Sequence, residues 1–118
     1  TQGNPSSVDG NFLQLSLGLG QTTCGIATSM TAYCWGANSK GQIGDGTTAD
    51  SLKPTQVQLL AGSVASISVG GFVDATDAHP CAVLSSGAVQ CWGFNSSGQL
   101  GTVNTLDSIA PKTVIFNP

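Results

Sequence analysis

One stretch of this chain occurs twice at a fixed distance. The segment Cys34–Gly44 (CWGANSKGQIG) is matched, 57 residues later, by Cys91–Gly101 (CWGFNSSGQLG). The same spacing holds without a gap from Cys24/Cys81 to Val57/Val114. Self-similarity at a fixed period of this order is typical of propellers and solenoids. A single unit of such a fold cannot bury its own apolar faces, so the units must stack on one another.

The repeat divides the chain into three segments. We expect a polar arm over residues 1–11, repeat 1 over 12–60 and repeat 2 over 61–118. The second repeat carries five extra residues before its first Cys, which predicts an inserted surface loop at about 71–80. The arm is either a frayed terminus or a segment that orders against a neighbouring subunit. It has no basic or apolar leader, so we expect a mature N-terminus.

Each repeat contains four short segments with strand character. The first, Phe12–Gly18 or Val64–Gly70, alternates apolar and polar residues, which is typical of a half-buried strand. A hairpin between the two Cys of each repeat supplies the next two strands. The fourth is expected to begin at a proline, over Pro54–Leu60 and Pro111–Phe116, because proline at a first position loses no ladder hydrogen bond. The prediction is an all-β fold of two propeller-type blades, each of four short antiparallel strands.

The four cysteines form two identical C-x9-C spacings, Cys24/Cys34 and Cys81/Cys91. Four cysteines allow three pairings, and the repeat selects Cys24–Cys34 and Cys81–Cys91, one disulfide in each hairpin. The alternative is zinc, but the close pairs of structural zinc sites are missing and His79 alone cannot complete two sites. Disulfides imply an oxidising compartment, so we expect a secreted, extracellular or cell-surface protein.

Composition excludes several partners. With Lys and Arg totalling 3 and a pI near 4.4, the chain has no basic surface for nucleic acid. No apolar run is long enough for membrane insertion. One histidine and paired cysteines leave no catalytic constellation, so we predict neither an enzyme nor a cofactor.

Two local features offer further chemistry. Asp74, Asp77 and His79 in the inserted loop could face a hard cation, but their spacing matches no known metal motif and a solvated loop is the expectation. Asn95-Ser96-Ser97 is an N-x-S sequon in an expected surface loop, which makes Asn95 a candidate glycosylation site.

The repeated motif C-W-G-x-N-x-x-G-Q-(I/L)-G, followed by P-x-x-V, resembles the regulator of chromosome condensation repeat, also called the alpha-tubulin suppressor-like repeat. The cysteines make it similar to the secreted microbial branch of that family. The resemblance implies a propeller, which in the family closes with about seven blades. The Asp45–Thr48 loop is replaced by Thr102–Thr105 in the second copy, and no residue matches the family's nucleotide-exchange loops.

The motif residues are expected to fill and shape the contact between neighbouring blades. The tryptophans supply an apolar body with an N–H donor, the glycines allow positive φ and close approach, and the amides tie loop backbone. These residues are Trp35, Gly36, Asn38, Gly41, Gln42, Gly44, Trp92, Gly93, Asn95, Gly98, Gln99 and Gly101. The alternative is a sugar site with tryptophan as the stacking platform.

Two blades alone would leave two apolar faces exposed. We therefore expect a non-catalytic extracellular structural protein that associates with itself, head to tail, into a ring or a filament. A glycan-binding oligomeric propeller is the first alternative. The second is a fragment of a larger propeller that serves as a protein-interaction module.

Overall fold

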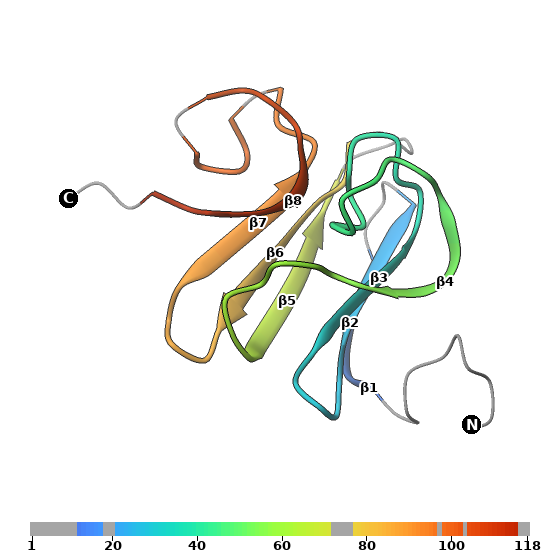
Figure 1. The fold of residues 1–118 in the computed structure, drawn as a ribbon, viewed down its shortest axis with the longest axis vertical. Coiled ribbons are helices and arrows are strands. Elements are labelled where there is room, and N and C mark those ends of the chain that lie inside the picture. Colours follow the sequence, from blue (N-terminus) through green and yellow to red (C-terminus); the bar gives the residue numbers. More distant parts are fainter. Residues whose placement is uncertain (1–11, 18–20, 72–76, 97, 103, 116–118) are drawn as a thin grey trace.

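The computed structural model describes residues 12–17, 21–71, 77–96, 98–102 and 104–115. These residues form two four-stranded antiparallel sheets, whose strands follow one another in chain order (Figure 1). The first sheet, called blade 1 below, contains β1 (Phe12–Leu17), β2 (Thr22–Ala27), β3 (Ala32–Gly36) and β4 (Ser51–Gln56). The second, blade 2, contains β5 (Val64–Gly70), β6 (His79–Leu84), β7 (Val89–Gly93) and β8 (Ser108–Thr113). The predicted fold class is confirmed.

A disulfide joins the two central strands of each blade. Cys24 lies directly opposite Cys34 on β2 and β3, and Cys81 lies opposite Cys91 on β6 and β7. In both bridges the Cα atoms are 4.0 Å apart. The pairing predicted from the repeat is therefore confirmed, and it ties the hairpin that carries each Trp-Gly pair.

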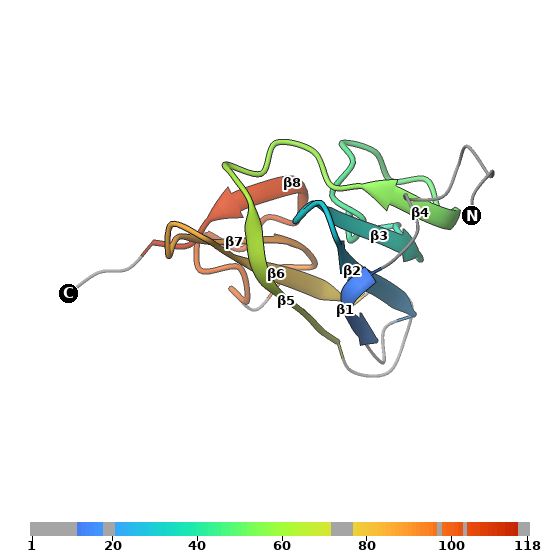
Figure 2. The same cartoon turned by 90° about the horizontal axis from the view of Figure 1, so that it is seen from below.

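The hydrophobic core lies between the two blades. Blade 1 contributes Ile26, Ile43 and Val57, and blade 2 contributes the inward side chains of β5 together with Trp92. Figure 2 shows β5 beside β1 and β2, where the sheets meet. Two side chains of β1 bond to the β5 backbone: the Gln14 Nε2 donates to the Ile67 carbonyl at 2.8 Å, and the Ser16 Oγ accepts from the Val69 N–H at 3.0 Å.

Strand β1 therefore faces the core with its polar side chains. Gln14 and Ser16 point toward blade 2, whereas Leu13, Leu15 and Leu17 are exposed. The predicted strand is present, but its apolar row lies on the side away from the core. The alternating pattern identified the strand and gave no information about which side blade 2 occupies.

Three expected boundaries were wrong. Strands β4 and β8 begin at Ser51 and Ser108, three residues before the prolines. Pro54 and Pro111 lie at register shifts of these outer strands, where the pairing to β3 and β7 is interrupted and no ladder N–H is needed. The inserted loop also ends earlier than predicted, because His79 and Pro80 belong to β6. The arm over residues 1–11 and residues 72–76 lie outside the described residues.

Candidate assembly interface

Trp92 is the central side chain of the contact between the blades. It is 0% exposed, and its Nε1 donates to the Gln42 carbonyl of blade 1 at 2.8 Å. Gly44 lies against the indole: a Cβ at this position would be 2.8 Å from Nε1, and its φ is +76°. Only glycine combines this backbone conformation with that approach. The motif of repeat 1 thus forms the seat for the tryptophan of repeat 2.

A second close approach joins blade 1 to β8. It is made by the loop Gly41–Gly44, which we call the glycine loop of blade 1, and by the residues that follow it. A Cβ on Gly41 would lie 2.6 Å from the Ser108 carbonyl oxygen and 2.5 Å from the Ile109 Cα. The Gly46 N–H donates to the Ile109 carbonyl at 2.9 Å. The two blades therefore contact each other through backbone as well as through the apolar core.

Gly36 and Gly93 serve a different contact, inside each blade. Their φ angles are +107° and +94°, and an added Cβ would lie 2.4 Å from the Gln21 carbonyl oxygen or 2.6 Å from that of Ala78. Each glycine allows the end of the third strand to pass close to the start of the second. Gly93 also lies close to blade 1, because the same Cβ would be 3.3 Å from the Gln42 Cα.

The motif asparagines hold the loops in place. Asn38 is 0% exposed; its Oδ1 accepts from the Ile43 N–H at 2.7 Å, and its Nδ2 donates to the Thr47 and Ala49 carbonyls at 3.0 and 2.9 Å. The neighbouring Gln42 Oε1 accepts from the Lys40 N–H at 2.8 Å. These side chains satisfy loop backbone groups that no strand pairs, as expected from the sequence.

Asn95 repeats this arrangement in blade 2. Its Oδ1 accepts from the Leu100 N–H at 2.8 Å, and its Nδ2 donates to the Asn104 and Leu106 carbonyls at 3.0 and 2.9 Å. The side chain is 0% exposed and both Nδ2 hydrogens are used. The folded protein therefore does not offer Asn95 as a glycosylation site. A sequon records residue order only and does not reveal that the amide is buried.

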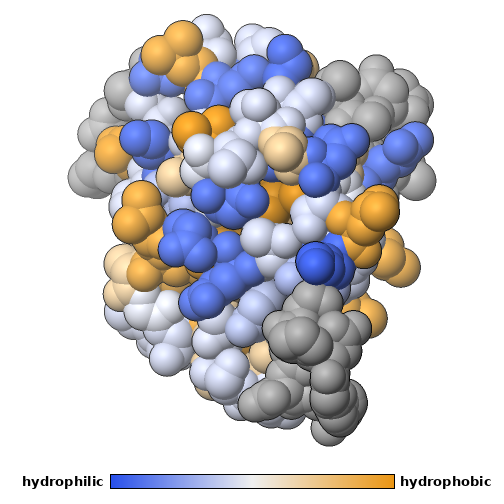
Figure 3. All heavy atoms as spheres, turned by 45° about the vertical axis from the view of Figure 1, so that its right-hand side comes forward, coloured by the Kyte–Doolittle hydropathy of each residue, from blue (hydrophilic) through white to orange (hydrophobic). Residues whose placement is uncertain are grey.

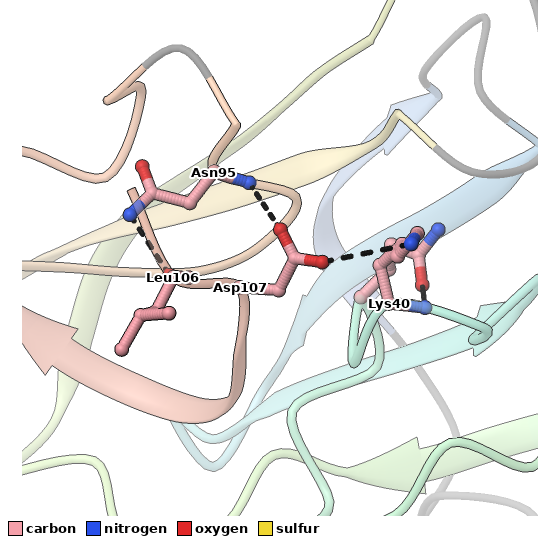
Figure 4. Close-up of polar contacts among 5 residues, drawn as sticks. Lys40, Asn95, Leu106 and Asp107 are labelled. Atoms are coloured by element: carbon pink, nitrogen blue, oxygen red, sulfur yellow. Dashed lines mark hydrogen bonds and ion pairs between the residues drawn. The ribbon is translucent and has the colours of Figure 1, made fainter. Parts of the chain in front are cut away.

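An ion pair crosses the blade contact at its rim (Figure 4). The Lys40 Nζ of blade 1 lies 3.8 Å from the Asp107 Oδ2 of blade 2, and both side chains are partly exposed. The other carboxylate oxygen, Asp107 Oδ1, accepts from the Asn95 N–H at 2.8 Å. Asp107 therefore fixes the loop of its own blade and faces the charge of the other. Asp50 of blade 1 accepts from the Asn38 N–H at 2.9 Å in the equivalent way.

The residues that bury blade 2 against blade 1 have uncovered counterparts on the outer side of blade 1. Ile67 and Val69 are 2% and 9% exposed, whereas their equivalents Leu15 and Leu17 are 54% and 77% exposed. Other equivalents are Phe12 for the buried Val64 and Trp35 for the buried Trp92. Leu52 is the equivalent of Ile109, which lies against Gly41 and stays 44% exposed at the internal contact. We call Phe12, Leu15, Leu17, Trp35 and Leu52 the blade 1 flank. On the face drawn in Figure 3, hydrophobic groups are interspersed with hydrophilic ones.

The outer side of blade 2 shows the complementary pattern. Ile26, which faces blade 2, is 2% exposed, and its equivalent Val83 is 40% exposed. Cys24 and Val57 are buried, whereas Cys81 and Val114 are partly exposed. The glycine loop of this side is Gly98–Gly101, the copy of the loop that seats Trp92. We call Cys81, Val83, Gly98–Gly101 and Val114 the blade 2 flank.

Sequence reasoning missed Leu52, the most exposed member of either flank at 99%. It lies in the register shift opposite Trp35, as Ile109 lies opposite Trp92. The signal that could have found it is the 57-residue spacing, which pairs Leu52 with Ile109 outside the recognisable motif.

The burial of these residues argues against the alternative interpretation of the motif as a sugar site. Trp92, Asn38, Asn95 and Gln42 are all 0% exposed, so they cannot stack on or bond to a glycan in the folded chain. Trp35 is partly exposed, but its ring packs on Phe12 with centroids 5.6 Å apart. The motif's aromatic and amide groups are used for the contact between blades and for the loops.

The inserted loop does not bring metal ligands together in the part that the structure describes. The His79 Nδ1 lies 3.1 Å from the Asp77 backbone oxygen, and its ring lies over Gly70, where a Cβ would be 2.4 Å from Nε2. Among the described ranges, no cluster of three or more His, Cys, Asp or Glu side chains could hold an ion. Asp74 lies outside those ranges.

The formed disulfides indicate a non-reducing environment. Across the described part of the chain, no helix has the length and hydrophobicity needed to cross a membrane.

Comparison with known proteins agrees with this geometry. Two models of the regulator of chromosome condensation (RCC1) repeat match residues 31–73 and 73–99. The ultraviolet-B receptor UVR8 of Arabidopsis thaliana is 32% identical over 111 residues, which are 92% of this chain and 24% of that protein. The probable E3 ubiquitin-protein ligase HERC3 of Homo sapiens is 36% identical over 99 residues, 77% of this chain and 9% of its own length.

A solved structure shows the same fold. Human WBSCR16 matches with a TM-score of 0.73 and 24% identity, over 92% of this chain and 26% of that one. The chain thus spans about a quarter or less of the proteins it resembles. It belongs to the regulator of chromosome condensation (RCC1) repeat family and carries two propeller-type blades of that kind.

Proposed function

We propose that this chain is a non-catalytic extracellular protein that assembles head to tail through its two flanks. The observation that carries the proposal is the difference in burial between equivalent residues. Apolar side chains that are buried where blade 2 meets blade 1 have exposed equivalents on the outer sides. The contact between blades 1 and 2 therefore indicates that each flank fits another blade with the same sequence pattern.

The two flanks differ, so the proposed contact joins the blade 1 flank of one copy to the blade 2 flank of the next. A contact of this heterologous kind closes into a ring if the rotation allows, and otherwise continues as a filament. Burial of one leucine-sized side chain contributes about 1.5–3 kcal/mol. The blade 1 flank exposes three leucines, Leu15, Leu17 and Leu52, whose burial would contribute to association.

The disulfides support an extracellular location, because bridges of this kind persist in oxidising compartments. The low charge of the chain, 8% of residues, is compatible with close self-association.

Sedimentation velocity over a wide range of protein concentrations tests the proposal. We expect species larger than a dimer to accumulate as concentration rises, because each copy keeps one unoccupied flank of each kind until a ring closes. A chain that sediments as a monomer at every concentration would contradict it.

A second candidate function follows from the relatives. The chain spans 24% of UVR8 and 9% of HERC3, which favours flanks that hold further repeats within a longer protein-interaction propeller. In that case the isolated chain stays monomeric, and adding neighbouring repeats to the same polypeptide removes the exposed apolar surface. Binding of a hydrophobic dye before and after the extension measures this difference.

A further inference from the structure

We infer that the joint between two copies has the same register as the internal blade contact, with the Trp35 indole N–H donating to the Gln99 carbonyl of the next copy. In this register Leu52 lies against Gly98 of that copy. The inference rests on the proposed function, and it adds the residues that pair and the direction in which they do so.

Trp35 supplies the first argument. The equivalent Trp92 Nε1 donates to the Gln42 carbonyl, and Gln42 is the equivalent of Gln99. Within the described residues, no hydrogen bond holds the Trp35 Nε1, although the ring packs against Phe12 with centroids 5.6 Å apart. A tryptophan N–H that becomes buried needs an acceptor. The Gln99 carbonyl occupies the position in blade 2 that serves this purpose in blade 1.

The glycine loop supplies the second argument. Gly41 has a φ of +85° and lies against the Ile109 backbone, which explains why a side chain is excluded there. Gly98 has nearly the same φ, +78°, yet nothing lies within 4 Å of its Cβ position. The blade 2 loop therefore already has the conformation of a loop that receives a neighbouring strand. The equivalent of Ile109 is Leu52, which is 99% exposed.

These two pairings give the assembly a direction. The tryptophan and Leu52 belong to one flank, and the glycine loop that receives them belongs to the other. Two copies of the same flank would oppose tryptophan to tryptophan and leave both indole donors without an acceptor. The register therefore disfavours a two-fold symmetric dimer.

Tryptophan fluorescence tests the register separately from assembly itself. Trp92 is already buried, so a shift of emission to shorter wavelength on assembly must come from Trp35. The unmodified chain and the variant Trp35→Phe are compared at concentrations that give the same assembled fraction by sedimentation. Trp35→Phe keeps an aromatic ring but no donor, and we expect about a fivefold weaker association constant and no emission shift.

Assembly of the unmodified chain without an emission shift would overturn the register while leaving self-association intact. Absence of assembly would overturn both proposals. The two failures are therefore distinguishable in one experiment.

Leu52→Asp provides a second test that does not disturb the fold, because the side chain is 99% exposed. We expect the association constant to fall at least about thirtyfold. The matched control is Leu106→Asp, also an exposed leucine at 72%, whose equivalent Ala49 stays exposed at the internal contact. Equal loss of association in both variants, or in neither, would contradict the register.

Discussion

Asn38 and Asn95 have the same task in the two repeats. Each is fully buried, and each uses both ends of its amide to hold the backbone of a loop that contains no regular strand. The loop that seats Trp92 depends on Asn38, because the Asn38 Oδ1 accepts from the N–H of Ile43, which lies between Gln42 and Gly44. A single amide thus links loop conformation to the blade contact.

Removing that amide should be costly. We expect Asn38→Ala to lower the free energy of unfolding by about 2–4 kcal/mol, because it leaves two carbonyls and one N–H without their partner. Urea denaturation measures the change. Gln58→Ala is the control, since the hydrogen bond that its side chain donates to the Gln56 carbonyl is exposed. A loss below that of the control would contradict the role assigned to Asn38.

The ion pair at the rim allows a sharper comparison. Lys40→Met and Asp107→Asn both remove the pair, but only the second weakens the acceptor of the Asn95 N–H. Partly exposed pairs contribute about 0–1 kcal/mol, so Lys40→Met should have little effect on unfolding. Asp107→Asn should cost about 1 kcal/mol more, because the charge-assisted bond to the backbone is the stronger contact. Equal losses of unfolding free energy in the two variants would contradict this, and would show that the ion pair contributes more than the bond to the Asn95 N–H.

At the scale of the strand, most features of the fold could be predicted from the repeat. The number of strands, their antiparallel order and the two disulfides followed from matching positions in the two copies. The position of the prolines was predicted wrongly, since a bulge on an outer strand tolerates proline as well as a strand start does. The direction faced by Leu15 and Leu17 could not be predicted, because both sides of a propeller-type sheet meet another sheet.

The contact between the blades was predictable only in part, because the sequence does not show which side of a blade meets a neighbour. The motif tryptophans and glycines could be named, but equivalent residues behave differently in the two blades. Trp92 is buried and Trp35 is partly exposed, although the surrounding sequence is nearly the same. What differs is whether a neighbouring blade is present, and a repeat motif does not encode that.

The two disulfides should differ in reactivity. Cys24 is 0% exposed because blade 2 covers it, whereas its equivalent Cys81 is partly exposed on the blade 2 flank. At a concentration where the chain is monomeric, under limiting reductant and rapid alkylation, we expect mass spectrometry to find Cys81 and Cys91 labelled before Cys24 and Cys34. Reductant reaches the exposed sulfur first. Simultaneous labelling of all four, or the opposite order, would contradict the assignment of Cys81 to an open flank.

At the scale of the whole molecule, the account depends on an asymmetry between the two ends of a short stack of blades. One end carries exposed leucines and a tryptophan, and the other carries the glycine loop with Val83 and Val114. The blade 1 flank is equivalent to the side of blade 2 that is buried inside the chain, and the blade 2 flank is equivalent to the buried side of blade 1. The proposed assembly continues this internal contact from one copy to the next.

Mixing two half-blocked variants tests this claim most directly. Leu52→Asp blocks the blade 1 flank and Val83→Asp blocks the blade 2 flank, and circular dichroism verifies that each variant is folded. Sedimentation velocity should find each variant monomeric alone and the equimolar mixture as a dimer that grows no further. Association of either variant with itself, or a mixture that stays monomeric while the unmodified chain assembles, would contradict head-to-tail assembly.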